Sequence, residues 1–248
     1  MQEPAPPDSA PVVLLIRPQE AAERFAAQIA PIGLRALVSP MLRIVPVAHD
    51  AAALGAATGL VFTSENGVRY AGPGRGRPAW CVGPRTAEAA AAAGYDAITG
   101  PGDAARLIPL ISDLGPGWLH AHGRHLAATL PVPGVVVYDQ QALPLSAPAQ
   151  ALLRGRAPVI LPLFSPRSAR LAAQALAPLA AGGPLAPLRL IAISEAARKA
   201  WDAHWPGPPR PATGTDTPDA EGMLRALSAQ EAGNAATSRR VEQFPRPV

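Results

Sequence analysis

The sequence predicts an α/β protein built from two similar lobes, each a mainly parallel sheet flanked by helices. Apolar runs of strand length alternate with Ala-rich stretches of helical length along most of the 248 residues, which is the pattern of parallel β–α units. A strand–turn–helix segment also occurs twice, beginning near Gly59 and again near Val159. A duplicated unit of this kind indicates two related lobes in one chain.

The two copies of the repeated segment are Gly59–Arg69 and Val159–Arg170. In each copy an apolar run ends in phenylalanine, a hydroxyl-bearing turn follows, and an arginine lies in the start of a helix, so that Phe62-Thr63-Ser64 corresponds to Phe164-Ser165-Pro166. Each lobe therefore has a helix N-terminus supplied with hydrogen-bond donors, which suits an anionic ligand.

Two further matches follow in the same order. The stretch Val82–Ala90 corresponds loosely to Ala192–Ala197, and Gly102–Leu107 corresponds to Pro218–Leu224. A lone hydroxyl residue after a strand is most often a helix cap, but three ordered matches favour a true internal repeat.

The first half of the chain predicts five helices between strands. In chain order, we expect extended segments at Val12–Arg17, Ala36–Leu42, Leu60–Thr63, Trp80–Val82, Trp118–Ala121 and Gly134–Tyr138, with helices at Glu20–Ile32, from Asn66, at Thr86–Ala93, at Asp103–Ile111 and near Leu126. Apolar runs define the strands and Ala-rich stretches the helices. Gly33 and Gly94 mark helix ends, and Asp103 is an N-cap candidate.

The second half repeats this order. Val159–Phe164 and Leu190–Ile193 are apolar runs that predict strands, and Ser168–Leu179 and Glu195–His204 predict the helices that follow them. Asp219–Leu227 predicts a last helix.

Composition limits the class of protein. Apolar residues make up 48% of the chain and charged residues 16%, which indicates a globular protein with one large core or two ordinary ones.

Lys199 is the only lysine, and all other basic side chains apart from histidine are arginines. The preference for arginine suits carboxylate or phosphate recognition, although a compositional bias toward Ala, Pro and Arg explains most of it. The chain shows no basic run with interleaved aromatic residues, so we expect no nucleic-acid partner.

Cys81 is the only cysteine, which excludes an intrachain disulfide and is compatible with a reducing cytoplasm. Its place in an apolar run predicts a buried, inert thiol. The Pro-rich start, Met1–Pro11, does not resemble a signal peptide, and no apolar run is long enough to span a bilayer. We expect residues 1–11 and 229–248 to be disordered tails.

Together these segments resemble the uroporphyrinogen-III synthase family, from Val12 to about Leu227. The segments that carry the resemblance are Arg17-Pro18, Phe62–Val68, Val82–Ala87, Gly123-Arg124, Val137-Tyr138 and Phe164–Ala169. Ile16 departs from the family, which often has threonine there, and Ile193-Ser194-Glu195-Ala196 replaces the Gly-x-x-Thr-Ala pattern in the second lobe.

The resemblance implies two lobes joined by a two-stranded linker, with the active site in the cleft between them. The first lobe would be discontinuous, residues 12–40 plus 142–228, and the second would be residues 45–137. The linker strands would lie near Val38–Val47 and Val136–Pro144, where Pro40, Pro46 and Pro144 fit extended connections.

The resemblance also implies a reaction. The family cyclises the linear tetrapyrrole hydroxymethylbilane, an octacarboxylate, to uroporphyrinogen III with loss of water and inversion of ring D, through a spiro-pyrrolenine intermediate. It implies no cofactor, no metal and no membrane partner. It further implies a cytoplasmic monomer that makes at most a transient contact with the preceding enzyme of tetrapyrrole biosynthesis.

Matching the family motifs places one catalytic candidate and ten substrate-binding candidates. Tyr138 would be the general acid that protonates the leaving hydroxyl; a linker tyrosine that only packs is the alternative, of equal weight. The substrate-binding candidates lie where strands meet helices, at the edge where open α/β sheets bind ligands. They are Arg17, Ser64, Asn66, Gly83, Thr86, Gly123, Arg124, Ser165, Ser168 and Ser194. For each hydroxyl the alternative is a helix cap, and for each arginine a solvated or structural role.

Two other patterns compete with this interpretation. His120, His122 and His125 are spaced like metal ligands, but no cysteine or carboxylate accompanies them, so we expect no metal site. Gly72-x-Gly74-x-Gly76 has no helix pattern after it and is interpreted as a loop. A non-catalytic two-lobe binding protein for an anionic small molecule remains the alternative function.

Overall fold

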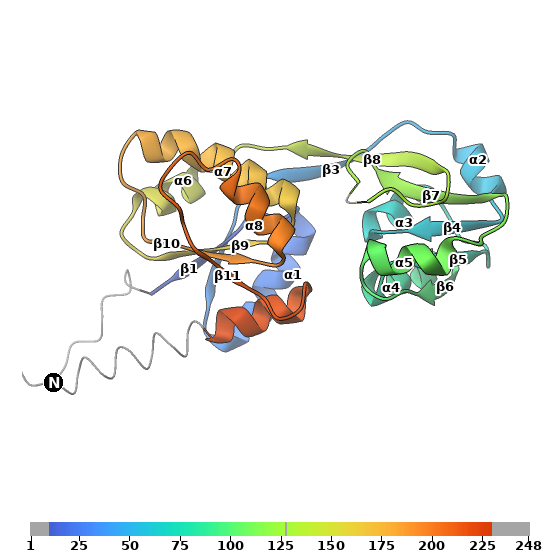
Figure 1. Ribbon diagram of the computed structural model, residues 1–248, viewed down its shortest axis with the longest axis horizontal. Helices are drawn as coiled ribbons and strands as arrows, with labels where there is room; N and C mark the ends of the chain where they lie inside the picture. Colours follow the sequence, from blue (N-terminus) through green and yellow to red (C-terminus); the bar gives the residue numbers. More distant parts are fainter. Residues whose placement is uncertain (1–9, 127, 230–248) are drawn as a thin grey trace, which may run out of the picture. The chain divides into compact units, whose positions relative to one another are not determined.

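The computed structural model describes residues 10–126 and 128–229 (Figure 1). The chain forms two compact units. Within the described residues, unit 1 comprises residues 10–43 and 142–229, and unit 2 comprises residues 44–126 and 128–141. The tails expected at 1–11 and 229–248 lie almost wholly outside the described residues.

Unit 1 is a five-stranded sheet with helices on both faces (Figure 1). The strand order is β11-β10-β9-β1-β2, and its strand pairs are parallel. The strands are β1 (Val12–Leu15), β2 (Arg35–Val38), β9 (Val159–Leu163), β10 (Leu188–Ala192) and β11 (Ala212–Gly214). The helices are α1 (Gln19–Ile29), the 3-10 turn η2 (Ala30–Ile32), α6 (Ala147–Arg154), α7 (Pro166–Ala181), α8 (Glu195–Asp202) and residues 220–229.

The alternation of side chains in β1 divides the core of unit 1 in two. Val13 and Leu15 pack with Phe25 of α1 and Met223 of the last helix. Leu14 points to the opposite core, which α6, α7 and α8 cover. Because successive strand residues face opposite sides, an unbroken apolar strand is the pattern of a sheet covered on both faces.

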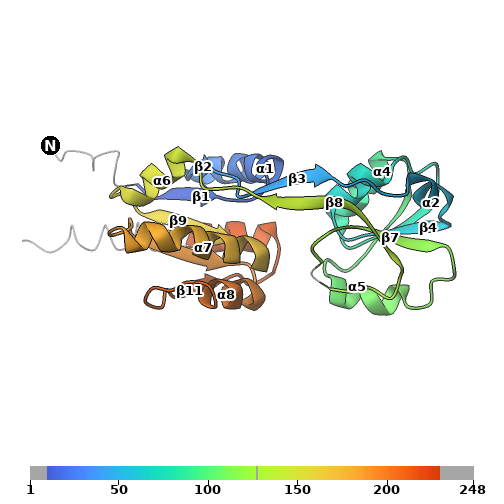
Figure 2. The same cartoon turned by 90° about the horizontal axis from the view of Figure 1, so that it is seen from above.

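Unit 2 is a six-stranded sheet of order β3-β8-β7-β4-β5-β6, also with helices on both faces (Figure 2). Its strands are β3 (Leu42–Pro46), β4 (Gly59–Phe62), β5 (Pro78–Cys81), β6 (Asp96–Thr99), β7 (Trp118–Gly123) and β8 (Gly134–Ala142). Its helices are α2 (Ala51–Ala56), α3 (Glu65–Ala71), α4 (Pro84–Ala92) and α5 (Ala104–Ile111). Helices α2, α3 and α4 cover one core, and α5 covers the other with Leu130 and Val132.

The two sheets share one topology. From its β11 edge, the sheet of unit 1 has the order β11-β10-β9-β1-β2. From its β6 edge, the sheet of unit 2 has the order β6-β5-β4-β7-β8, and each of these strands corresponds to the strand at the same position in unit 1. Strand β3 is an additional sixth strand next to β8. The duplicated segments supply the central strands β9 and β4. The internal repeat is therefore confirmed in three dimensions. β1, the first strand of the chain, occupies the place that β7 takes in unit 2.

Most predicted elements are confirmed, but the helix near Leu126 is wrong. Residues 124–126 and 128–133 form bends and irregular chain. Pro131 and Pro133 limit helix formation there, and Leu130 and Val132 instead fill the core beneath α5. The extended segment Ala36–Leu42 is two separate strands, β2 and β3. The sequence interpretation missed α2, α6, β6 and β11.

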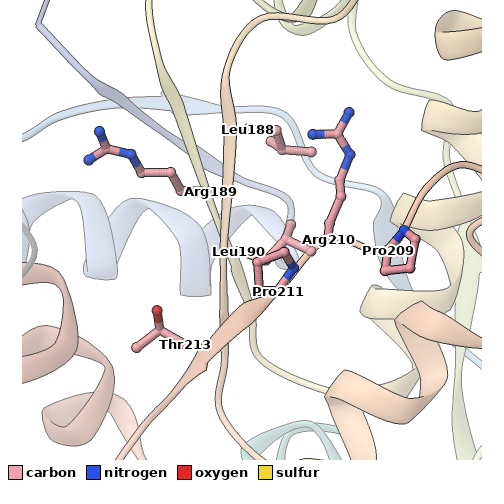
Figure 3. Close-up of a pocket in the computed structure, with 7 residues that line it drawn as sticks. All are labelled: Leu188, Arg189, Leu190, Pro209, Arg210, Pro211 and Thr213. Atoms are coloured by element: carbon pink, nitrogen blue, oxygen red, sulfur yellow. The ribbon is translucent and has the colours of Figure 1, made fainter.

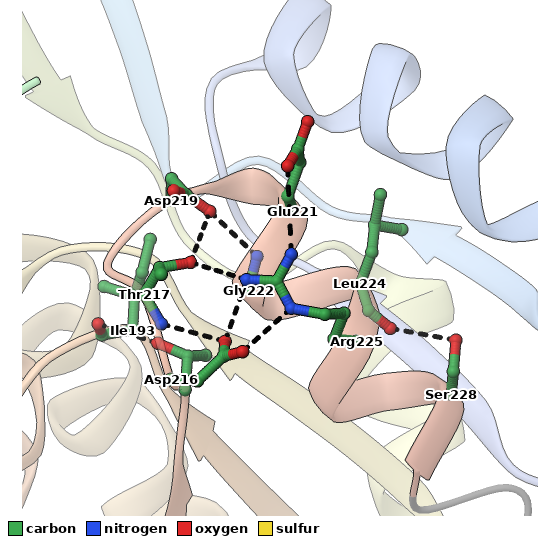
Figure 4. Close-up of polar contacts among 10 residues, drawn as sticks. Ile193, Asp216, Thr217, Asp219, Glu221, Gly222, Leu224, Arg225 and Ser228 are labelled. Carbon is green, nitrogen blue, oxygen red and sulfur yellow. Dashed lines mark hydrogen bonds and ion pairs between the residues drawn. The ribbon is translucent and has the colours of Figure 1, made fainter.

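The loop after β11 is closed by a polar network around Arg225 (Figure 4). Arg225 Nε donates to Asp216 Oδ2 at 2.8 Å, and Thr217 Oγ1 donates to Asp219 Oδ1 at 2.9 Å. Asp219 also accepts from the Gly222 N–H at 2.8 Å, just as Asp103 accepts from the Arg106 N–H at 2.8 Å at the start of α5. The third match of the repeat is therefore a pair of aspartate N-caps.

None of the helices within the described residues is long and apolar enough to cross a membrane.

Candidate functional site

The predicted site residues gather at the carboxyl ends of the strands in each unit. In unit 2, Ser64 follows β4, Gly83 follows β5, and Gly123 ends β7 beside Tyr138 of β8. In unit 1, Arg17 follows β1, Ser165 follows β9 and Ser194 follows β10. Since the strands concerned are parallel, these residues share one edge of their own sheet, which is where α/β proteins bind ligands.

Three predicted serines are helix N-caps. Ser64 accepts from the Asn66 N–H at 3.1 Å, Ser165 from the Ser168 N–H at 3.1 Å, and Ser194 from the Ala197 N–H at 3.3 Å. The capping alternative is thus observed at all three. Capping uses a lone pair and leaves the hydroxyl hydrogen for another acceptor. At Ser165 the Ser168 hydroxyl, whose oxygen lies 2.9 Å away, is one such acceptor.

Ser168 and Thr86 lie deeper than the caps. Ser168 is 3% exposed, and its hydroxyl donates to the Ser165 carbonyl at 3.0 Å. Thr86 is 5% exposed, in the first turn of α4. That helix has Gly83 as its N-cap, with no capping side chain, and Pro84 without an N–H at its first position. Because Gly83 has no side chain, it cannot cap the backbone N–H groups at the start of α4. These N–H groups are therefore suited to binding an anion.

Tyr138 lies buried against Gly123. Its side chain is on β8, paired with Gly123 across a register shift between His122 and Gly123, and the residue is 5% exposed. A methyl group on residue 123 would lie 2.5 Å from the Tyr138 ring and 2.9 Å from its hydroxyl. Only glycine allows this approach.

The environment of Tyr138 shifts the acidity of its phenol in two opposing directions. Burial raises the pKa of Tyr138, and hydrogen bonds with the side chains of Ser64 and Gln140 and the backbone of Gly123 oppose this in part. The group therefore holds its proton at neutral pH, and the same hydrogen bonds would stabilise the phenolate left after it gives the proton away.

The two candidate arginines are held in different ways. The Arg17 guanidinium lies 4.0 Å from the centroid of the Phe164 ring, a cation–π contact that fixes the plane of the group. Arg124 forms an exposed ion pair, its Nε 3.2 Å from Asp139 Oδ2. An exposed pair of this kind is worth about 0–1 kcal/mol, so a substrate carboxylate can compete with Asp139.

Several neighbours of Tyr138 escaped the sequence analysis. Gln140 is one, and Tyr70 is another, its ring centroid 6.3 Å from that of Tyr138. Thr63 lies 3.0 Å from His120 Nε2. The sequence signal that pointed to this region was the placement of His120 and His122 on one face of a strand. That signal was compared with metal ligands and not with a hydrogen bond to Thr63.

The histidines do not form a metal cluster. His125 lies toward Asp139, with its Nε2 3.5 Å from Oδ1, whereas His120 contacts Thr63. Within residues 10–126 and 128–229, no group of three or more His, Cys, Asp or Glu side chains is arranged to hold a metal ion. Cys81 is buried, and burial raises the pKa of its thiol to about 11, as expected for an inert side chain.

A hollow of about 350 Å³ lies at the opposite end of β10 from Ser194 (Figure 3). It is lined by Leu188, Arg189, Leu190, Pro209, Arg210, Pro211 and Thr213. None of the predicted site residues lines it, and it lies at the amino ends of β10 and β11. It is therefore separate from the candidate site.

Comparison with known proteins identifies one family. The family model described as "Uroporphyrinogen-III synthase HemD" matches residues 23–224. A crystal structure of uroporphyrinogen-III synthetase from Helicobacter pylori has 17% identity and a TM-score of 0.58, covering 89% of this chain and 99% of that chain. Wild-type uroporphyrinogen III synthase from the extremely thermophilic bacterium Thermus thermophilus has 18% identity and a TM-score of 0.40, covering 92% and 100%. No curated protein sequence matches at a significant level.

Proposed function

Because the chain belongs to the uroporphyrinogen-III synthase family, we propose that its reaction is carried by Tyr138 and by substrate contacts at the strand edges of both units. The reaction is the cyclisation of hydroxymethylbilane to uroporphyrinogen III, with loss of water and inversion of ring D, in tetrapyrrole biosynthesis. The alternative of a non-catalytic binding protein is not favoured by the family match.

Tyr138 is the proposed proton donor. The hydroxymethyl group of the substrate leaves as water only if its oxygen gains a proton, and a neutral phenol can supply one. The observation that carries this role is the setting of Tyr138, a buried phenol hydrogen-bonded with Ser64, Gln140 and Gly123. In our proposal the Ser64 hydroxyl accepts from the Asn66 N–H and donates its one hydrogen either to the Tyr138 oxygen or to a substrate carboxylate.

The eight carboxylates of the substrate are proposed to bind helix starts and arginines. The starts of α4, α7 and α8 present amide groups and hydroxyls at their strand edges, and a helix N-terminus favours negative charge. The proposed contacts are Arg17, Ser64, Asn66, Gly83, Thr86, Gly123, Arg124, Ser165, Ser168 and Ser194. They occur at the strand edges of both units.

The identifying experiment supplies hydroxymethylbilane and separates the isomers formed. Uncatalysed closure gives the type I isomer, so type III product above background demonstrates the activity. We expect Tyr138→Phe to keep the fold and the KM but to lower turnover by about 10²-fold, the low end of the range for a lost proton donor. The hydroxymethyl group on an electron-rich pyrrole already leaves readily, and holding the flexible substrate ready to close supplies much of the rate.

Matched controls are Ser64→Ala and Ser165→Ala, each of which should lower turnover less than Tyr138→Phe. Full single-turnover rate and type III product from Tyr138→Phe would exclude Tyr138 as the acid and leave positioning to carry the reaction.

We also propose that the protein is a cytoplasmic monomer that acts without a cofactor. Prolonged treatment with a chelator should leave the rate unchanged. If the chelator lowers the rate and added zinc restores it, the histidine residues would have to be reconsidered as metal ligands.

A further inference from the structure

Two histidines lie side by side beneath the Tyr138 edge, and the proposed mechanism uses neither. His120 and His122 are 2% and 9% exposed, on the same face of β7, with ring centroids 4.7 Å apart. Burial and the neighbouring His122 lower the pKa of His120 to about 3. His120 is therefore uncharged at neutral pH and offers one donor and one acceptor nitrogen.

His120 ties the turn after β4 to β7. Its Nε2 lies 3.0 Å from Thr63 Oγ1, a hydrogen-bonding distance between neighbouring strands. Thr63 is followed by Ser64, the N-cap of α3 and a hydrogen-bonding partner of the Tyr138 hydroxyl. A shift of Thr63 would therefore carry Ser64 with it.

His122 holds the backbone on the other side of Tyr138. Its Nδ1 lies 2.7 Å from the Gly123 carbonyl. A carbonyl only accepts, so Nδ1 carries a hydrogen and donates it. The Nε2 atom lies over Gly134, where a methyl group would be 2.4 Å from it. Gly123 is the residue at the register shift between β7 and β8, and Tyr138 packs directly on it.

We propose that His120 and His122 are positioning residues for the cyclisation. His120 fixes the Thr63-Ser64 turn, and His122 fixes the irregular backbone at Gly123. The Tyr138 hydroxyl is hydrogen-bonded with both of these features. The inference rests on the proposed role of Tyr138. A catalytic group must be held within about 0.5 Å of its productive place, and a misplacement of about 1 Å can lower the rate about 10²-fold.

Each ring of the pair has one nitrogen directed at a neighbouring group of the protein. His120 Nε2 is directed to Thr63, and His122 Nδ1 is directed to a carbonyl. The rings lie against one another with an interplanar angle of 36°. The contacts use one nitrogen of each ring for the protein itself, as expected of side chains that hold backbone in place.

Two pairs of variants test the proposal. Thr63→Val keeps the shape but removes the hydroxyl, and Thr63→Ser restores it. His122→Leu removes the donor to Gly123, and His122→Asn places an amide nitrogen near the Nδ1 position. We expect Thr63→Val and His122→Leu to lower kcat about 10-fold with KM unchanged and to raise the share of type I product. Thr63→Ser and His122→Asn should stay within about threefold of wild type.

The matched control is His204→Leu in unit 1. His204 Nδ1 lies 2.9 Å from the Ala200 carbonyl, so this variant also loses a histidine–carbonyl contact, but on an exposed helix end. We expect kcat and the isomer ratio of His204→Leu to equal those of wild type. All rates are compared at a temperature at which circular dichroism shows every variant to be folded.

A second measurement does not depend on turnover. Nitrogen-15 NMR should show hydrogen on His122 Nδ1, and carbon-13 NMR of the tyrosine rings should show the Tyr138 pKa shifted in Thr63→Val and His122→Leu but not in His204→Leu. Unchanged kcat and isomer ratio in both test variants, or a Tyr138 resonance that does not respond, would overturn the inference. Absence of type III product from the wild-type protein would instead overturn the proposed function, while the NMR result still decides the positioning.

Discussion

At the scale of single residues, position 123 requires glycine because the Tyr138 ring packs directly against it. A methyl group there would lie 2.5 Å from the Tyr138 ring carbons, closer than van der Waals contact allows, so Gly123→Ala must displace the ring. We expect a loss of about 1–3 kcal/mol of unfolding free energy from overpacking and a fall in turnover at least as large as that of Tyr138→Phe. Urea denaturation and the isomer assay measure the two effects.

The matched control for this prediction is Gly55→Ala. Gly55 lies in helix α2, and a methyl group there would meet nothing within 4 Å. Alanine should stabilise the helix by about 0.5–1 kcal/mol relative to glycine and leave turnover unchanged. A Gly123→Ala protein as active as Gly55→Ala would show that Tyr138 need not stay in its observed place.

His120 predicts an acid-sensitive fold. Its pKa is lowered from 6.5 to about 3 in the folded state by burial and by His122. Between these values the unfolded chain binds a proton that the folded chain does not, so the stability that His120 contributes is complete above about pH 6.5 and is lost as the pH falls toward 3. The slope from one such group is about 1.4 kcal/mol per pH unit.

Chemical denaturation between pH 4 and pH 8 measures this slope. In His120→Gln the amide can still reach Thr63 but cannot titrate, so the difference between wild type and variant should shrink steadily as the pH falls below 6.5. Parallel stability curves for the two proteins across this range would contradict the assignment to His120.

The residue roles divide into those that local sequence reveals and those that it does not. The caps Ser64, Ser165 and Asp103 could be predicted because a cap and its partner amide are within three residues of each other. The contact between Thr63 and His120 spans 57 positions and depends on β4 lying beside β7. The spacing of the histidines in sequence is like that of metal ligands, but it gave no sign of the hydrogen bonds that the fold makes with them.

At the scale of elements, the strength of the apolar pattern decides what could be predicted. Strands β4 and β9 are buried at every position and were found. Strand β6, the edge of its sheet, is mostly exposed, and α2 has a single buried residue, Leu54. Elements that bury so little leave almost no periodic signal. Their positions follow from the neighbours they pair with.

Ser165 allows capping and substrate binding to be separated within one element. It caps α7, a helix that places four buried apolar residues in the core of unit 1. Ser165→Ala should cost about 1 kcal/mol of stability. Ser165→Asp retains a good cap, so its stability should stay near wild type, but its charge should repel a substrate carboxylate and raise KM. Melting curves and Michaelis kinetics on the two variants measure these effects. Unchanged KM in Ser165→Asp would limit Ser165 to capping.

At the scale of the whole molecule, the repeat explains why the chain returns to its first unit. β1 lies between β9 and β2, and it takes the place that β7 takes in the sheet of unit 2. The segment containing β1, α1 and β2 therefore completes a sheet whose other strands come more than a hundred residues later. The local pattern could predict each strand, but only the order of strands shows this dependence.

This topology predicts unequal behaviour of isolated fragments. Residues 42–142 contain every strand of the unit 2 sheet and should unfold cooperatively by themselves. Residues 142–229 lack β1 and α1, whose Val13, Leu15 and Phe25 form the core beneath Ile160 and Met223, so this fragment should not fold.

A permuted chain provides the control for this prediction. It joins residues 142–229 through a long Gly/Ser linker to residues 10–43, which restores β1, α1 and β2 to the sheet without unit 2. Because every strand pair of the five-stranded sheet is then present, the permuted chain should regain a cooperative thermal transition. Circular dichroism melting distinguishes the three proteins. Cooperative melting of residues 142–229 alone would show that β9, β10 and β11 need no first strand, and the dependence inferred from the sheet order would be wrong.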